Sequence, residues 1–464
     1  MNVNIISSKV KLHWHGYIVI GLLLTVNLLI NFMLIKYADY TWIVVIYNLS
    51  IVVVVVSYLY IKNLPTFLLI LGILPLAYID NIFSLYFNYI IIQNIPIYLF
   101  FALSIFYFTA TTENVSLNYG YLTLPIYLIT IYSSLLFILG FMKGGVLSIV
   151  TNELYQHLYY FLAIPIIYLI KDRRNLIILF SALAITFLIV SFQYIYLNLF
   201  SDMRITTYHN VFLSFLLGFF YSKLLFKQNN INIKLVLIIG ISIVWIASIL
   251  INTRILWICN LLTMATITFF YLRNYPKMLR WFKYFSVLTL VLLVALLFNY
   301  SKESTIFNPE KTQERLESLS DPLGDLSFLM RIEIGQASFY KFLESPIWGE
   351  GFGKQLKFKI FTDTEVYFID NSFLYFLWKG GLISLFLFSL LFYRIIYSSY
   401  IIFDKSEDIT IKILSISILG GVVSFIFYGL LSASLIGYKL NLLYAIIIGY
   451  LEFERNNLLK NEKI

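Results

Sequence analysis

Apolar residues occur in long, uninterrupted runs along this chain, and short polar segments separate them. The runs cover residues 16–35, 42–61, 65–80, 95–111, 120–141, 156–170, 175–199, 209–222, 235–252, 254–272, 281–299, 370–393, 412–434 and 437–453. They are apolar throughout and do not alternate as the strands of a membrane β-barrel do, so they predict helices. At about 20 apolar residues per crossing, we expect an all-α, polytopic integral membrane protein with about 12–14 transmembrane helices.

The composition agrees with this class and excludes others. Of 464 residues, 60% are hydrophobic and 12% are charged, whereas a soluble domain carries about 25% charged residues. An ordinary soluble enzyme is therefore excluded, and so is a disordered chain, which needs low hydrophobicity. One Cys and four His exclude a disulfide framework and argue against a metal site with several ligands.

Lys and Arg concentrate in one alternating set of loops, which includes both chain ends. Cytoplasmic loops of membrane proteins carry an excess of these residues, so we expect both termini in the cytoplasm. The net charge of +9 follows largely from this bias and implies no nucleic-acid partner.

One long polar segment interrupts the pattern, and the alternation places it outside the cytoplasm. We therefore expect an N-terminal transmembrane bundle over 1–299, an extracytoplasmic loop over 300–369, and C-terminal transmembrane helices with a short cytoplasmic tail over 370–464. Apolar residues at helical spacing predict an amphipathic helix in the loop from about residue 326 to 345. A long loop in a compact protein is more often functional than a spacer.

Three arginines belong to the expected extracytoplasmic side. Arg331 lies in the amphipathic helix, Arg254 lies at a span's mouth, and Arg204 lies in a short loop ahead of His209 and Asn210. A lone arginine there either extends to the lipid headgroups or serves a function. Guanidinium groups match phosphate oxygens in bidentate geometry, so a convergent set would suit the pyrophosphate of a membrane lipid.

Asp370 and Asn371 begin the span that follows the long loop. One interpretation is a helix N-cap, a position that both residue types favour. The other is a functional group at the mouth of a span. Asp370 would then orient an arginine or accept a proton from a sugar hydroxyl, and the second role requires burial because an ordinary aspartate is a weak base.

Two further groups are candidates of lower specificity. Gly349, Gly351 and Gly353 alternate at a spacing of two, which either forms a plain turn or leaves backbone amides approachable for a ligand. Glu153 and His157 lie one helical turn apart, but two ligands do not make a metal site. We therefore expect no metal.

Several of these motifs, in this order, resemble the signature of the O-antigen ligase and polymerase superfamily of integral-membrane glycosyltransferases of the GT-C type. The matching segments are Arg331-x-x-x-Gly335-x-Ala337, Pro346-x-x-Gly349-x-Gly351-x-Gly353, Asp370-Asn371-Ser372-Phe373-Leu374 and Gly380-Gly381. Ligases of this family carry His-Asn where this chain has Asp370-Asn371, so the resemblance favours a polysaccharide repeat-unit polymerase.

The resemblance implies a role for each candidate residue. Catalytic roles fall to a carboxylate and two arginines, and the remaining residues bind substrate. The catalytic set is Arg254, Arg331 and Asp370, and the substrate-binding set is Arg204, His209, Asn210, Gly349, Gly351, Gly353 and Asn371.

The implied activity is polymerisation of undecaprenyl-pyrophosphate-linked repeat units of O-antigen, capsule or exopolysaccharide at the outer face of the bacterial cytoplasmic (inner) membrane. Its partners would be these lipid-linked glycans, membrane lipid and a chain-length regulator protein. No cofactor is expected, because the substrate itself carries the energy-rich bond. Two alternatives stay open: a ligase that moves finished glycan to another acceptor, and a flippase or transporter, which the lack of internal repeats disfavours.

Overall fold

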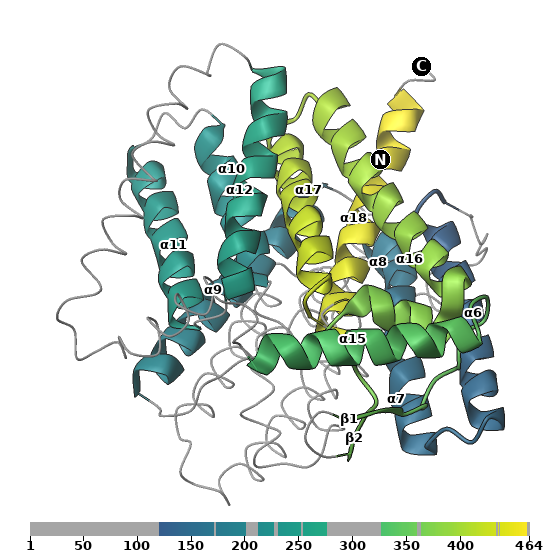
Figure 1. Cartoon of the computed structure of the whole chain (residues 1–464). Helices are drawn as coiled ribbons and strands as arrows, with labels where there is room; N and C mark the ends of the chain where they lie inside the picture. Colours follow the sequence, from purple (N-terminus) through teal and green to yellow (C-terminus); the bar gives the residue numbers. More distant parts are fainter. Residues whose placement is uncertain are drawn as a thin grey trace, which may run out of the picture. The chain divides into compact units, whose positions relative to one another are not determined.

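The computed structural model describes residues 120–170, 173–200, 212–226, 231–251, 254–275, 326–359, 363–432, 435 and 437–461, and these are mostly helical (Figure 1). Contacts divide the chain into two compact units. Met1–Ser116 with Pro165–Val190 form one, and Leu117–Ile164 with Ser191–Ile464 form the other.

Most of the helices coincide with the apolar runs, and α7 and α15 lie mainly outside them. Their bounds are α6 (Thr123–Met142), α7 (Leu147–Leu158), the 3-10 helix η3 (Tyr159–Leu162), α8 (Ala163–Leu169), α9 (Arg173–Phe200), α10 (Phe212–Leu225), α11 (Ile231–Leu250), α12 (Arg254–Asn274), α15 (Leu326–Glu344), α16 (Ser372–Lys405), α17 (Ile409–Gly429) and α18 (Tyr438–Asn461).

Five helices within the described residues are long and apolar enough to cross a membrane: α6, α11, α12, α16 and α17. The expectation of a helical chain built to span a membrane is confirmed to this extent. The expected spans at 16–35, 42–61, 65–80, 95–111 and 281–299 lie outside the described residues.

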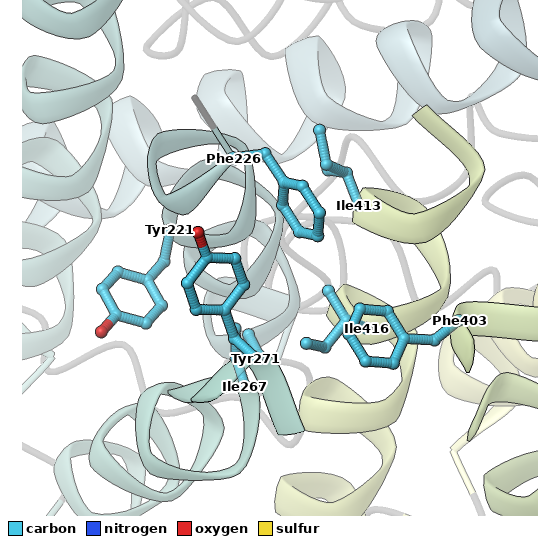
Figure 2. Packing of buried hydrophobic residues seen from close by; sticks show 7 residues of the cluster. All are labelled: Tyr221, Phe226, Ile267, Tyr271, Phe403, Ile413 and Ile416. Atoms are coloured by element: carbon cyan, nitrogen blue, oxygen red, sulfur yellow. The ribbon is translucent and has the colours of Figure 1, made fainter. Parts of the chain in front are cut away.

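Aromatic and β-branched side chains form one core where α10, α12 and α17 meet the end of α16. Figure 2 shows this cluster, whose members are Tyr221, Phe226, Ile267, Tyr271, Phe403, Ile413 and Ile416. The two tyrosine hydroxyls are paired: that of Tyr221 lies 2.9 Å from Thr268 Oγ1, and that of Tyr271 donates to the carbonyl of Leu225. Buried tyrosines usually find such partners.

Small residues bring α12 and α17 close together. A Cβ added to Gly420 would lie 3.0 Å from the carbonyl oxygen of Thr263. The Thr263 and Ser424 hydroxyls are 2.6 Å apart across the same interface. Small and hydroxyl-bearing side chains are typical of helix contacts within membranes.

A helix is present where the sequence predicts one, as α15, and it packs against α16. In Figure 1 it runs crosswise, whereas α12 and α17 stand upright. Ser338 and Phe342 are buried on its inner side, while the apolar Phe339 and Leu343 remain exposed on its outer side. The helix ends at Glu344, just before Pro346, as a proline at that position dictates.

The sequence analysis does not predict the β-hairpin that follows. Strands β1 (Leu356–Lys359) and β2 (Asp363–Val366) pair antiparallel, with Lys357 opposite Glu365. The chain then enters α16, which kinks at Gly381 (φ 62°). A Cβ at Gly381 would lie 2.3 Å from the carbonyl oxygen of Ile347, so the kink needs glycine.

Candidate functional site

Arg331 and Asp370 form an ion pair between α15 and the start of α16. Arg331 Nε lies 3.6 Å from Asp370 Oδ2, and the two side chains are 46% and 42% exposed. Solvent weakens a pair this exposed, so an incoming anion can compete with the carboxylate for the guanidinium. The structure thus brings together two candidates that lie far apart in the sequence.

Asn371, next to this pair, is the N-cap of α16. Its Oδ1 accepts hydrogen bonds from the backbone N–H groups of Phe373 and Leu374, both at 3.0 Å. The two interpretations of the Asp-Asn pair therefore divide between its members. Asn371 caps the helix, and the carboxylate of Asp370 pairs with Arg331.

The next residue holds this end of α16 in place. The hydroxyl of Ser372 donates to the carbonyl of Ser432 at 2.8 Å and accepts from the N–H of Leu435 at 3.1 Å. Both partners lie between α17 and α18. Buried hydrogen bonds therefore hold the chain two residues after Asp370.

The three alternating glycines form a tight loop wedged against α6, α7 and α16. Their φ angles are +70°, +88° and +72° for Gly349, Gly351 and Gly353, a region that favours glycine. Added Cβ atoms would meet backbone or core: Gly349 at 2.4 Å from the Lys379 carbonyl oxygen, and Gly351 at 2.5 Å from the Gly140 nitrogen.

The amides of these glycines are used inside the protein, which corrects the expectation that they are approachable. Gly349 donates to the carbonyl of Ser345, and Gly351 donates to the carbonyl of Lys379. Gly353 donates to the carboxylate of Glu153. The loop's observed role is to fasten the end of α15 to the kink in α16, because the three glycine amides satisfy protein acceptors.

A buried ion pair lies directly behind the loop. Lys379 Nζ on α16 is 3.1 Å from Glu153 Oε1 on α7, and the side chains are 1% and 0% exposed. Lys379 also donates to the carbonyl of Lys354. Burial raises the pKa of the Glu153 carboxyl above its ordinary value. The Lys379 ammonium and the Gly353 amide offset only part of that rise. The pair thus connects α7, α16 and the segment that follows the glycine loop.

His157 lies beside the buried pair and contacts both α7 and the glycine loop. Its Nδ1 lies 2.7 Å from the carbonyl oxygen of Glu153, and its ring stacks on Phe352 in the glycine loop. Glu153 and His157 are thus engaged with the protein itself. Within the described residues, no group of three or more His, Cys, Asp or Glu side chains could hold a metal ion.

The sequence reasoning missed the Glu153–Lys379 pair, although a signal for it exists. Ionisable residues within apolar segments are almost always paired, and Lys379 lies in such a segment, the run 370–393.

Several expected site residues are not placed. The described residues do not include Arg204, His209 and Asn210. Arg254 is the first residue of α12, and the structure describes its backbone but not its side chain. The convergence of three arginines stays a prediction.

A scan against protein-family models finds no match to this chain, and a search of curated proteins finds none either. The class that the fold and composition define is a mostly helical protein with several helices long and apolar enough to cross a membrane.

Proposed function

We propose that this protein is a polysaccharide repeat-unit polymerase of the bacterial cytoplasmic membrane, with its active site on the outer face and both termini in the cytoplasm. It joins oligosaccharide repeat units carried on undecaprenyl pyrophosphate. The observation that carries the proposal is the half-exposed pair of Arg331 and Asp370 at the mouth of an apolar helix long enough to cross the membrane.

The chemistry requires a cationic group where the leaving group develops charge. A hydroxyl of the acceptor attacks the anomeric carbon of the donor glycan, a new glycosidic bond forms, and the bond to the lipid pyrophosphate breaks. Arg331 binds the departing pyrophosphate, and a fixed cation is worth most where charge develops. The acceptor's proton passes to Asp370 or to the leaving phosphate.

The exposed ion pair supports this sequence of events. When a lipid pyrophosphate arrives, its oxygens compete with Asp370 for the guanidinium, since phosphate and carboxylate bind the same fork of N–H donors. The carboxylate is then released beside the bound substrate, where it can orient or deprotonate the acceptor. Asn371 and Ser372 keep Asp370 in place during the exchange.

The decisive experiment replaces Arg331 by Ala in the bacterium that carries the protein and resolves its glycans by length. We expect single lipid-linked or surface repeats in place of a ladder of lengths. Arg331→Lys should restore part of the ladder, because it keeps the charge and loses the bidentate fork. Arg273→Ala is the matched control: it removes an exposed guanidinium, stacked over Tyr400, from the far end of α12.

Other outcomes point to other functions. A ligase variant would accumulate long lipid-linked chains that never reach their acceptor. A transporter variant would retain repeats at the inner face of the membrane. An unchanged ladder in Arg331→Ala would contradict both the polymerase and the ligase.

A further inference from the structure

A second polar site lies at the other end of α15. A pocket of about 450 Å³ opens between the turn after α6, the end of α15, the glycine loop and β1. Its lining includes Gly144, Val146, Lys341, Glu350, Lys354 and Lys357. Pockets of roughly 300–1,000 Å³ are the size that holds a small ligand.

Three lysines and one glutamate line this pocket. Lys341 and Lys357 are each paired with a carboxylate. Lys354 Nζ donates to the carbonyl oxygen of Lys143 at 2.7 Å. In the part of the chain that the structure describes, no carboxylate forms an ion pair with Lys354. Because an ammonium carries three donors, Lys354 can bind an anion while keeping its carbonyl contact.

The single glutamate contacts a tryptophan and, at a longer distance, one of the three lysines. Glu350 Oε2 accepts a hydrogen bond from the Trp378 indole at 3.1 Å, and its Oε1 lies 4.0 Å from Lys341 Nζ. Lys341 is also paired with Glu344 on its own helix. These contacts place the Lys341 ammonium at the rim of the pocket.

Lys357 adds charge from the hairpin. Its ammonium pairs with Glu365 across the two strands, and its side chain is 74% exposed. A pair this exposed contributes little stability, so an anion in the pocket can draw the ammonium toward it.

We propose that this pocket binds an oxyanion carried by the glycan, a carboxylate or a phosphate on one of its sugars. The inference rests on the proposed function and adds that the polymer is acidic. Lys341 follows Arg331 by ten residues on α15, which separates them by about 15 Å along the helix axis at 1.5 Å per residue. One pyrophosphate cannot fill both sites, so the pocket takes a group further along the chain.

The test measures protection of lysines in the purified full-length protein. Acetylation rates of Lys341 and Lys354 are followed by mass spectrometry with digalacturonate, glucose 6-phosphate or neutral maltose present. We expect several-fold slower labelling of both Lys341 and Lys354 with a charged sugar, no change with maltose, and weaker protection at high salt. Lys405, exposed at the end of α16, is the control lysine.

The probes separate the two oxyanions. Protection by digalacturonate assigns the pocket to acidic sugars, and protection by glucose 6-phosphate assigns it to phosphorylated ones. Equal labelling of Lys354 with all three probes would overturn the proposal.

A variant extends the test. Lys354→Gln should raise the concentration of charged sugar that half-protects Lys341 about tenfold, as expected for the loss of one charge-assisted hydrogen bond. Its backbone carbonyl, which accepts from Lys379, is unchanged, so the buried ion pair should persist. Lys405→Gln should leave the protection of Lys341 as it is. Protection unaltered by Lys354→Gln would argue against the site.

Failure of this inference is distinguishable from failure of the proposed function. If Arg331→Ala leaves the glycan ladder intact while charged sugars still protect Lys354, the polymerase assignment fails and the anion pocket stands. If Arg331→Ala abolishes the ladder and no probe protects Lys354, only the pocket fails.

Discussion

Two ion pairs involve the beginning of α16, and they differ in nearly every physical respect. Arg331 and Asp370 are about half exposed and 3.6 Å apart. Glu153 and Lys379 are fully buried, 3.1 Å apart, and share their remaining bonds with Gly353 and the backbone of Lys354. Water and ligands can reach the first pair and not the second.

The comparison distinguishes a buried pair, which stabilises the fold, from an exposed pair, which can exchange its partner for a ligand. Removing one partner of a buried pair leaves an uncompensated charge in a low dielectric, whereas removing one partner of an exposed pair leaves a solvated one. We therefore assign Glu153 and Lys379 to the framework, and under the proposed function Arg331 and Asp370 act in the chemistry. Three predictions test this division.

The largest effect on stability is expected at the buried pair. Glu153→Ala leaves the Lys379 ammonium without its carboxylate and the Gly353 amide without its acceptor, and it should lower the free energy of unfolding by about 3–5 kcal/mol. The measurement is thermal unfolding in detergent, followed by size-exclusion fluorescence.

The matched control for that variant removes both charges. Glu153→Gln combined with Lys379→Met keeps an oxygen for the Gly353 amide and should recover most of the lost stability. If the single variant proved as stable as the native protein, the framework role of the pair would be wrong.

An intermediate effect is expected in the glycine loop. Gly351→Ala places a Cβ 2.5 Å from the Gly140 nitrogen at a φ of +88°, so it combines backbone strain with a collision against α6. Gly144→Ala has a similar φ of +76° and meets nothing within 4 Å, so it reports the strain alone, about 1–3 kcal/mol.

The difference in unfolding temperature between these two alanine variants measures how tightly the loop is wedged. We expect Gly351→Ala to be clearly the less stable. Equal stability of the two would mean that the loop can move away from α6, and the framework would then be looser than the contacts indicate.

The smallest effect on stability is expected at the exposed pair. A double-mutant cycle with Arg331→Ala and Asp370→Ala should give a coupling energy of about 0–1 kcal/mol, the range of exposed ion pairs. The same single variants should nevertheless alter glycan length under the proposed function. A coupling energy as large as that of the buried pair would place Arg331 in the framework and remove the distinction.

The helices could be predicted from the sequence because the patterns that indicate them involve only neighbouring residues. Continuous apolar runs predict the long helices, since a chain in lipid must satisfy its backbone hydrogen bonds internally. Helical periodicity together with Pro346 predicts α15 almost to the residue. The Asp-Asn pair predicts the start of α16, because capping depends only on neighbouring amides.

Only part of the candidate site could be predicted from the sequence. The motif order brought attention to Arg331 and Asp370, but nothing local shows that they touch. The glycine spacing indicated a special loop, yet the same spacing fits a loop that offers its amides to a ligand and one that uses them internally. The hairpin after the loop is too short for its alternation to stand out from noise.

What the sequence by itself determined is therefore the class of protein, the positions of most described helices and the residues worth testing, because hydropathy, periodicity and capping act over a few neighbouring residues. Only the tertiary structure decided which charge meets which. Glu153 binds the amide of Gly353 across 200 residues of chain, and such contacts follow from how α6, α7, α15 and α16 pack together. A side chain's role as framework or as reacting group depends on its burial and partners, which packing alone creates.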